Sequence, residues 1–441
     1  MSTDRLSKTV IVLALAAISL LWPALWNGYP LVFADSGTYL SQAIERYAGW
    51  DRPVFYSLFL FPLHMTVTTW PAIVVQALLI AYLLHLLRRT LLPGTAVWWL
   101  LVLVGILTVT SPLPWFTSQL MPDVFTGVVV VALALLAFAA DRLSAAERIA
   151  LVVLTTFAIA VHLSHVLLAI ALLAVLLPMR RSWASAGRCI APLALAVLAL
   201  VSVNLIAFGR ASLAPFGNVF LLARVIYDGP GMDVLRRDCP AAGWRLCPFV
   251  ESMPPHWDDF LWRVDGPLAR AGGAKLVSRD ADAIVAAALI AEPGTELLSF
   301  ASNATEQFVR FSSGDGLQPW PETVGPSIAR HFPSFENVAF ATSRQSIGTL
   351  TVPRLLQILD SATAVAGIAG CCAILCIAPR RHLAAGLAVA VLVALLANAA
   401  VTGGLSGPHD RYQSRIMWLP PVVALLAVAS LRRAASAGNT R

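Results

Sequence analysis

Two aspartates stand beside long apolar stretches of this sequence, where charged side chains are rare. Asp35 follows the first apolar stretch, in the segment NGYPLVFADSGTYL, and Asp123 follows Pro122 at the start of a later one. A carboxylate held at a membrane surface is costly unless it is used. Asp35 is therefore the first candidate for chemistry, either as a general base or as a ligand of a cation beside a phosphate leaving group.

Both aspartates also have an ordinary structural interpretation. Asp35 or Ser36 suits the N-cap of a short helix that lies on the membrane surface. Asp123, next to Pro122, suits the first turn of a helix. If the two carboxylates converge in the same compartment, they would form a metal site or an acid/base pair.

Basic residues collect before the last apolar stretch, in the segment GGLSGPHDRYQSRIMW. This segment holds His409, Asp410, Arg411 and Arg415. Arginine is suited to bidentate contacts with phosphate oxygens, so this cluster favours an anionic, lipid-linked substrate. The alternative is an internal ion pair of Asp410 with Arg411 or Arg415.

Two histidines inside an apolar region form another candidate pair. His162 and His165 are three residues apart and would share one face of a helix. They would either ligate a metal or line a pocket, or else pack between helices as a hydrogen-bonded pair.

Two cysteines lie in the polar segment RRDCPAAGWRLC. Cys239 and Cys247 have seven residues between them, including a Pro-Ala-Ala-Gly turn. This spacing predicts a small disulfide loop if the segment faces an oxidising compartment. A zinc site would need two further ligands, and only His256 is close in the sequence.

The elements that must position these residues are apolar helices. The 441-residue chain is 58% hydrophobic and only 12% charged, which indicates an all-α polytopic membrane protein. A transmembrane helix needs about 20 apolar residues. We expect about ten such helices, and residues 54–69 form either a short lead-in helix or part of a broken span. The expected spans are residues 9–26, 70–87, 95–111, 122–140, 148–163, 164–178, 189–208, 359–378, 383–402 and 416–431.

The distribution of basic residues predicts the orientation of these helices. If the spans alternate, the arginine pairs near residues 88, 180, 380 and 432 all fall on one side, which places both termini in the cytoplasm. The net charge of +7 is then mostly a topology signal and not a sign of nucleic-acid binding. The polar residues 209–355 become an extracytoplasmic soluble insertion between transmembrane modules at 1–208 and 356–441. Within the insertion, apolar spacing predicts two amphipathic helices separated by residues 292–294.

Several common catalytic motifs are absent from the sequence. There is no G-x-x-x-x-G-K-[ST], no H-E-x-x-H and no C-x-x-C, and no G-x-G-x-x-G opens a helix after a strand. We therefore expect no nucleotide cofactor.

Short motifs around Asp35 resemble a known family. Asp35 after the first span, Tyr39 four residues on, and an Arg52-Pro53 step leading to Tyr56 resemble the GT-C superfamily of polytopic membrane glycosyltransferases. An Arg411-Tyr412 step before the last span is similar to that family as well.

The resemblance implies a sugar transfer from a polyprenyl-phosphate donor to an extracytoplasmic glycan or lipid acceptor, at the inner (plasma) membrane. It implies that Asp35 is the catalytic or metal-associated acid, that Asp123 is a second acidic residue, and that Arg411 binds the lipid phosphate. We expect Tyr39, Arg52, His162, His165, His409 and Arg415 to contact substrate. Mg²⁺ or Mn²⁺ is the cofactor to expect if Asp35 and Asp123 hold a metal. The competing classes are a transporter or flippase of a lipid-linked saccharide and a non-enzymatic envelope assembly protein.

Overall fold

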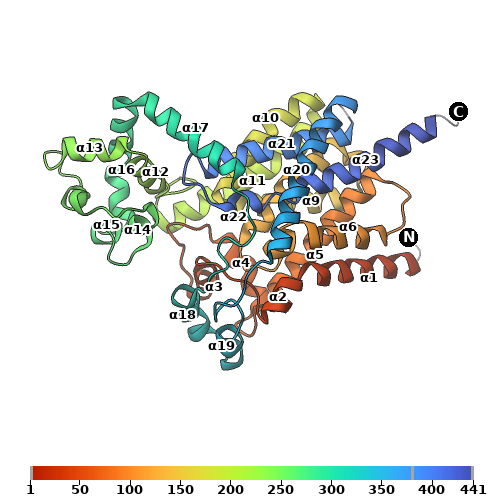
Figure 1. Cartoon of the computed structure of the whole chain (residues 1–441), viewed down its shortest axis with the longest axis horizontal. Helices are drawn as coiled ribbons and strands as arrows, with labels where there is room; N and C mark the ends of the chain where they lie inside the picture. The colour runs from red at the N-terminus through yellow and green to blue at the C-terminus, as the bar shows by residue number, and fades with distance from the viewer. Residues whose placement is uncertain (1–2, 379–381, 439–441) are drawn as a thin grey trace.

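The protein is built entirely from helices in the part of the chain that the computed structural model describes, residues 3–378 and 382–438. Helices account for 74% of the residues, and no strand occurs within these ranges. The long apolar helices form one bundle (Figure 1). They are α1 (Thr3–Leu20), α5 (Trp70–Leu91), α6 (Trp99–Thr110), α8 (Phe125–Phe138), α9 (Ala145–Ala160), α10 (Leu163–Arg180), α11 (Trp183–Phe208), α20 (Arg354–Ile377), α21 (Leu383–Thr402) and α23 (Leu419–Gly438).

Six segments among the described residues are long and apolar enough to cross a membrane. They are α5, α10, α11, α20, α21 and the run Asp410–Arg433, which includes most of α23. The chain is therefore consistent with a polytopic membrane protein, but the expected count of about ten spans is not confirmed. Three of the remaining expected spans fall on shorter helices: α6 has 12 residues, α8 has 14 and α9 has 16. At 1.5 Å per residue, α6 is about 18 Å long, less than the roughly 30 Å of hydrocarbon.

Helix α8 occupies the centre of the bundle. All of its 14 residues are buried, and it contacts α5, α9, α10, α11 and α21. A helix that is apolar on every face is stable only when it is covered on every face. The 3₁₀ turn η1 (Pro122–Val124) leads into α8, so Asp123 lies at the entrance to the most buried helix.

Short helices connect the bundle on the side where Asp35 lies. They are α2 (Trp22–Asn27), α3 (Ser36–Glu45), α4 (Phe55–His64), α7 (Leu113–Thr117) and α22 (Asp410–Ser414). Helix α4 is a separate 10-residue helix, so residues 54–69 do not continue into α5 as one helix. A second 3₁₀ turn, η2 (Ala140–Arg142), joins α8 to α9.

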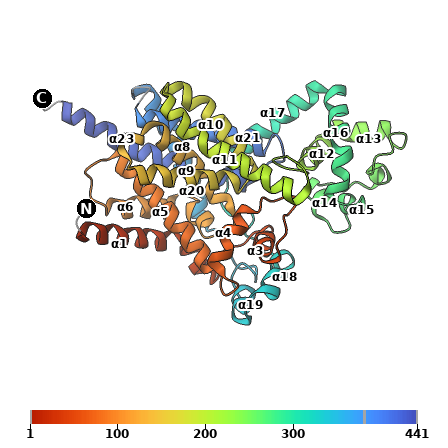
Figure 2. The ribbon, with the colours of Figure 1, turned by 180° about the vertical axis from the view of Figure 1, so that it is seen from behind.

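The polar residues between α11 and α20 pack in two parts. The first part has its own hydrophobic core, which runs from Phe216 to Ala288. It stands apart from the bundle in Figures 1 and 2. Its helices are α12 (Asn218–Tyr227), α13 (Pro230–Asp238), η3 (Cys247–Ser252), α14 (Trp257–Trp262), α15 (Pro267–Arg270), α16 (Ala274–Ala291) and α17 (Pro293–Val309).

Two predictions for this part are confirmed. Cys239 and Cys247 form a disulfide, with 5.4 Å between their Cα atoms. The expected amphipathic pair is α16 and α17, which meet at Glu292 with a bend of 103°.

The second part packs on the segment that carries Asp35. It consists of α18 (Pro321–His331) and α19 (Ser334–Ala341), and α18 lies against α3 in both views (Figures 1 and 2). Glu336 of α19 accepts hydrogen bonds from the hydroxyl groups of Tyr29 and Thr69. These hydrogen bonds join α19 to Tyr29, before α3, and to Thr69, before α5. Together with the packing of α18 on α3, they fix the position of the segment that carries Asp35.

The two ends of the described chain lie on the same side of the bundle. The start of α1 and the end of α23 are at one end of the molecule, and the core from Phe216 to Ala288 is at the other (Figure 1). Of the basic residues used to predict orientation, Arg380 and Arg381 lie outside the described residues.

Candidate functional site

Asp35 occupies the N-cap position of α3 without acting as its cap. Its side chain makes no capping hydrogen bond, and Oδ2 instead lies 2.9 Å from a guanidinium nitrogen of Arg52. Ser36 is engaged elsewhere, since its hydroxyl donates to the carbonyl of Leu120. The carboxylate of Asp35 is therefore free of a helix-capping role and remains 15% exposed.

Arg52 lies between two carboxylates. It pairs with Asp35 and lies 3.9 Å from Asp51. Burial lowers the pKa of Arg52, but Asp35 and Asp51 raise it more, so its net pKa is above the ordinary value and the guanidinium stays charged. Burial also raises the pKa of Asp51, and Arg52 only partly offsets that effect. One guanidinium and two carboxylates therefore form an ion-pair group just before the start of α4.

Asp123 forms a second, deeper ion-pair group with the C-terminal loop. It is 1% exposed, and its carboxylate lies 3.1 Å from Arg415 and 3.6 Å from Arg411. Arg415 has no exposed surface and also donates to Asn398 and Ser164. The alternative in which Asp410 pairs with Arg411 or Arg415 is wrong, because Asp410 pairs with Arg310 at 3.4 Å.

Arg411 connects the deeper group to the first loop. Its guanidinium carbon lies 3.6 Å from the ring centroid of Phe33, two residues before Asp35. Its backbone N–H donates to the carboxylate of Asp315. Its Nη1 atom is ion-paired with Asp123 at 3.6 Å but is buried without a hydrogen-bond partner. A cation that stacks on an aromatic face keeps its N–H groups free for another acceptor.

Tyr39 lies between the two ion-pair groups. Its ring packs edge-on against Tyr56, with 5.0 Å between centroids, and its buried hydroxyl has no hydrogen-bond partner. Burial raises the pKa of Tyr39 far above its ordinary value; Arg52 counteracts this shift, while Asp35 and Asp123 add to it. The hydroxyl therefore stays protonated and is a free donor beside three charged side chains.

His162 and His165 form a packed pair. Their rings stack with 5.0 Å between centroids. His165 uses both ring nitrogens, one toward the Thr126 hydroxyl and one toward the Ala158 carbonyl. Its nitrogens are therefore already engaged, as the hydrogen-bonded alternative expects.

His409 faces the insertion and not Asp35 or Asp123. Its ring packs against Trp257 and Tyr412, and Nδ1 lies 4.0 Å from Asp315. The basic cluster expected from the sequence is thus divided: Arg411 and Arg415 point inward, and His409 points toward the insertion.

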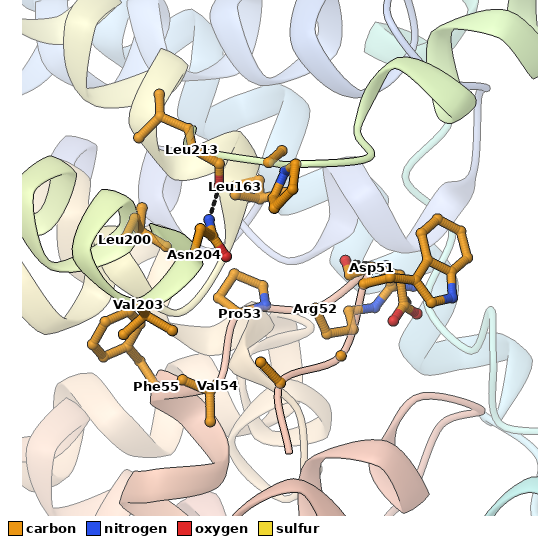
Figure 3. Close-up of a pocket in the computed structure, with 15 residues that line it drawn as sticks. Asp51, Arg52, Pro53, Val54, Phe55, Leu163, Leu200, Val203, Asn204 and Leu213 are labelled. Atoms are coloured by element: carbon orange, nitrogen blue, oxygen red, sulfur yellow. Dashed lines mark hydrogen bonds and ion pairs between the residues drawn. The ribbon is translucent and has the colours of Figure 1, made fainter. Parts of the chain in front are cut away.

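A cleft opens beside Arg52 (Figure 3). Its empty volume, which includes its opening to solvent, is about 360 Å³. One wall comes from α11, where Asn204 donates to the carbonyl of Leu213. The walls are mostly apolar and the charged end holds Asp51 and Arg52, a combination that suits a ligand with an apolar body and an anionic group. The lining residues are Ala48, Gly49, Trp50, Asp51, Arg52, Pro53, Val54, Phe55, Leu163, Leu200, Val203, Asn204, Leu213, Ala214 and Pro215.

The sequence alone did not single out several of these groups. Asp51 could have been noticed as a second carboxylate beside Arg52. Asn204 and Asn398 carry no local signal, because each lies in a long apolar helix and its importance depends on what that helix faces.

The carboxylates are poorly suited to a divalent cation. Asp35 is held by Arg52, and Asp123 is held by Arg411 and Arg415. A metal ion would have to compete with these guanidinium groups at each carboxylate. Within residues 3–378 and 382–438, no group of three or more His, Cys, Asp or Glu side chains is placed to hold a metal ion.

No protein-family model, curated protein or solved structure matches this chain. The functional conclusion must therefore come from the geometry of the site.

Proposed function

We propose that this protein is a membrane glycosyltransferase of the GT-C type. It moves a sugar from a polyprenyl-phosphate donor to an extracytoplasmic glycan or lipid acceptor. The observation that carries the proposal is the Asp35–Arg52 pair beside a cleft with apolar walls. The charged end suits the phosphate, and the apolar walls suit the isoprenoid unit next to the phosphate.

The residues divide the reaction between them. Asp35 accepts the proton of the acceptor hydroxyl as its oxygen forms a bond to the anomeric carbon of the sugar. The bond between that carbon and the phosphate oxygen breaks, and the phosphate leaves with the bonding electrons. Arg52, which lines the cleft, stabilises the negative charge that develops on the phosphate.

Arg411 and Tyr39 supply further donors to the leaving group. Each has a buried donor without a hydrogen-bond partner, Nη1 in Arg411 and the hydroxyl in Tyr39. These donors would stabilise the charge on the leaving phosphate without a metal ion. We therefore expect transfer to persist in the presence of EDTA.

The proposed orientation places both termini in the cytoplasm and the insertion outside it, at the inner (plasma) membrane. Two observations support it. The disulfide of Cys239 and Cys247 is suited to an oxidising compartment. The start of α1 and the end of α23 lie opposite the insertion (Figure 1).

The test is transfer of radiolabelled sugar from a panel of polyprenyl-phosphate donors by the purified protein. Asp35→Asn keeps the size of the side chain but removes the base, so we expect transfer to fall by about 10²–10⁴-fold. The matched control is Asp265→Asn in the insertion, whose carboxylate pairs with Arg263 at the surface and does not contact α3. Wild-type activity in Asp35→Asn would sink the assignment of the base.

The transfer assay, combined with donor binding and with donor movement in vesicles, separates the competing classes of protein. A donor that binds the wild type but is never transferred, and that moves between leaflets of a vesicle, would indicate a transporter or flippase. Absence of both binding and transfer across the panel would favour an assembly protein.

A further inference from the structure

An exposed apolar corner lies where α16 meets α17. Ile290 is 81% exposed, Leu297 is 68% exposed and Leu298 is 72% exposed, and Leu289 is also exposed. We call residues 289–298 the α16–α17 corner. Scattered single apolar side chains need no explanation, but a group on one turn of the chain indicates an interaction surface.

Few charged side chains lie in the corner itself: of the five acidic residues in 280–309, Asp280, Asp282 and Glu306 lie outside it. Residues 280–309 contain no lysine or arginine. The acidic residues of the corner are Glu292 and Glu296, and Glu296 is buried in an ion pair with Arg224. Together α16 and α17 are long and apolar enough for a membrane span, but the 103° bend prevents them from crossing as one straight helix.

The corner is connected directly to a candidate membrane span. Helix α17 packs on the end of α21, where a Cβ atom at Gly403 or Gly404 would meet Asn303 or Phe300. In Figures 1 and 2, α17 runs from the bundle to α16 along the same edge of the molecule as α10. The C-terminal half of α17 is therefore held against the end of α21, a candidate span.

We propose that the α16–α17 corner inserts its apolar side chains into the lipid of the membrane that the bundle crosses. Lipid acyl chains are the occupant because the corner is uncharged on its exposed apolar side and is fixed to the end of a span. An interfacial helix buries its apolar face about 5–10 Å below the headgroup boundary. The inference concerns how the insertion is held on the membrane and does not depend on the proposed sugar transfer.

The test measures the immersion of two labelled positions. Leu298→Cys and Val264→Cys each receive a nitroxide label in a full-length background whose four free cysteines are replaced by alanine, with the disulfide retained. Val264 is 95% exposed in the same insertion and serves as the control. Collisions with oxygen and with a nickel chelate are compared in vesicles of phosphatidylethanolamine and phosphatidylglycerol.

We expect the label at position 298 to collide mainly with oxygen, at a depth of about 5–10 Å. The label at position 264 should collide mainly with the nickel chelate. Equal access of the chelate to both positions would overturn the proposal. Shielding of position 298 from both reagents would also overturn it, because that result indicates contact with another protein surface.

Discussion

Asp123 and Arg415 are almost completely buried, whereas Asp35 and Arg52 keep 15% and 19% of their side chains exposed. The two ion-pair groups therefore differ in how far water reaches their charges. A partly exposed pair can exchange partners with a substrate at modest cost. A buried pair is difficult to break, because each charge left behind loses its compensation. We assign the first group to the reaction and expect the Asp123–Arg415 pair of the second group to hold the bundle together.

Replacing Asp123 tests this division at the residue level. Asp123→Asn leaves Arg415 buried without its carboxylate, and we expect the free energy of unfolding to fall by about 3–5 kcal/mol. Thermal unfolding in detergent, followed by near-ultraviolet circular dichroism, measures the change. The double variant Asp123→Asn/Arg415→Met should recover part of the loss. Unchanged stability together with lost transfer would instead place Asp123 in the chemistry.

Tyr39 permits the opposite test. Its hydroxyl is buried without a hydrogen-bond partner, so Tyr39→Phe removes a polar group that the fold does not use. We expect the unfolding temperature to stay the same or rise, while the rate of transfer falls. If both quantities are unchanged, the hydroxyl takes no part in binding the leaving group.

At the level of elements, the position of the proposed base depends on the contact between α3 and α18. Gly37 lies in the first turn of α3, and a Cβ atom there would collide with the backbone of Thr323. Glu45, at the other end of α3, pairs with Arg330 and His331 of α18. The helix that carries Asp35 is thus held along its length by a segment almost 300 residues away in the sequence.

Gly37→Ala should therefore move α3 away from α18. We expect a loss of about 1–3 kcal/mol of stability from overpacking, and reduced transfer because Asp35 moves with the helix. The matched control is Gly187→Ala in α11, where a Cβ atom has open space. That substitution should be neutral or stabilise by about 0.5–1 kcal/mol. Equal behaviour of the two variants in unfolding and transfer assays would contradict the role of the α3–α18 contact.

For the whole molecule, function depends on which compartment the insertion faces. The proposed orientation brings the first loop, α22 and the insertion to one side of the membrane, and the basic loops near α10 and α11 to the other.

Two positions with equal exposure test this orientation. Val264 in the insertion and Trp183 at the start of α11 are each 95% exposed. In the background whose four free cysteines are replaced by alanine, with the disulfide retained, a membrane-impermeant maleimide should label Val264→Cys on intact cells. It should label Trp183→Cys only after the inner membrane is permeabilised. The reverse pattern would place the insertion in the cytoplasm and remove the support that the disulfide gives.

The sequence by itself determined the local features of this protein. Continuous apolar runs predicted the helices of the bundle, since burial in lipid or in a core requires apolar side chains over the whole length of a helix. The bend between α16 and α17 occurs where the sequence Glu-Pro-Gly interrupts the apolar run. The disulfide joins cysteines that are close in the sequence. The number of spans was less certain, because a short apolar run does not specify whether its helix crosses the membrane or ends within the bundle.

Only the tertiary structure decided how the charged residues are paired. The sequence allowed Asp35 and Asp123 to be helix caps, metal ligands or catalytic acids, and it allowed Asp410 to pair with its neighbours. The structure instead pairs Asp35 with Arg52 and Asp123 with Arg411 and Arg415. The physical reason is that ion pairing depends on distance in space, which is set by how the helices pack, whereas composition and periodicity report only the surroundings of one helix at a time.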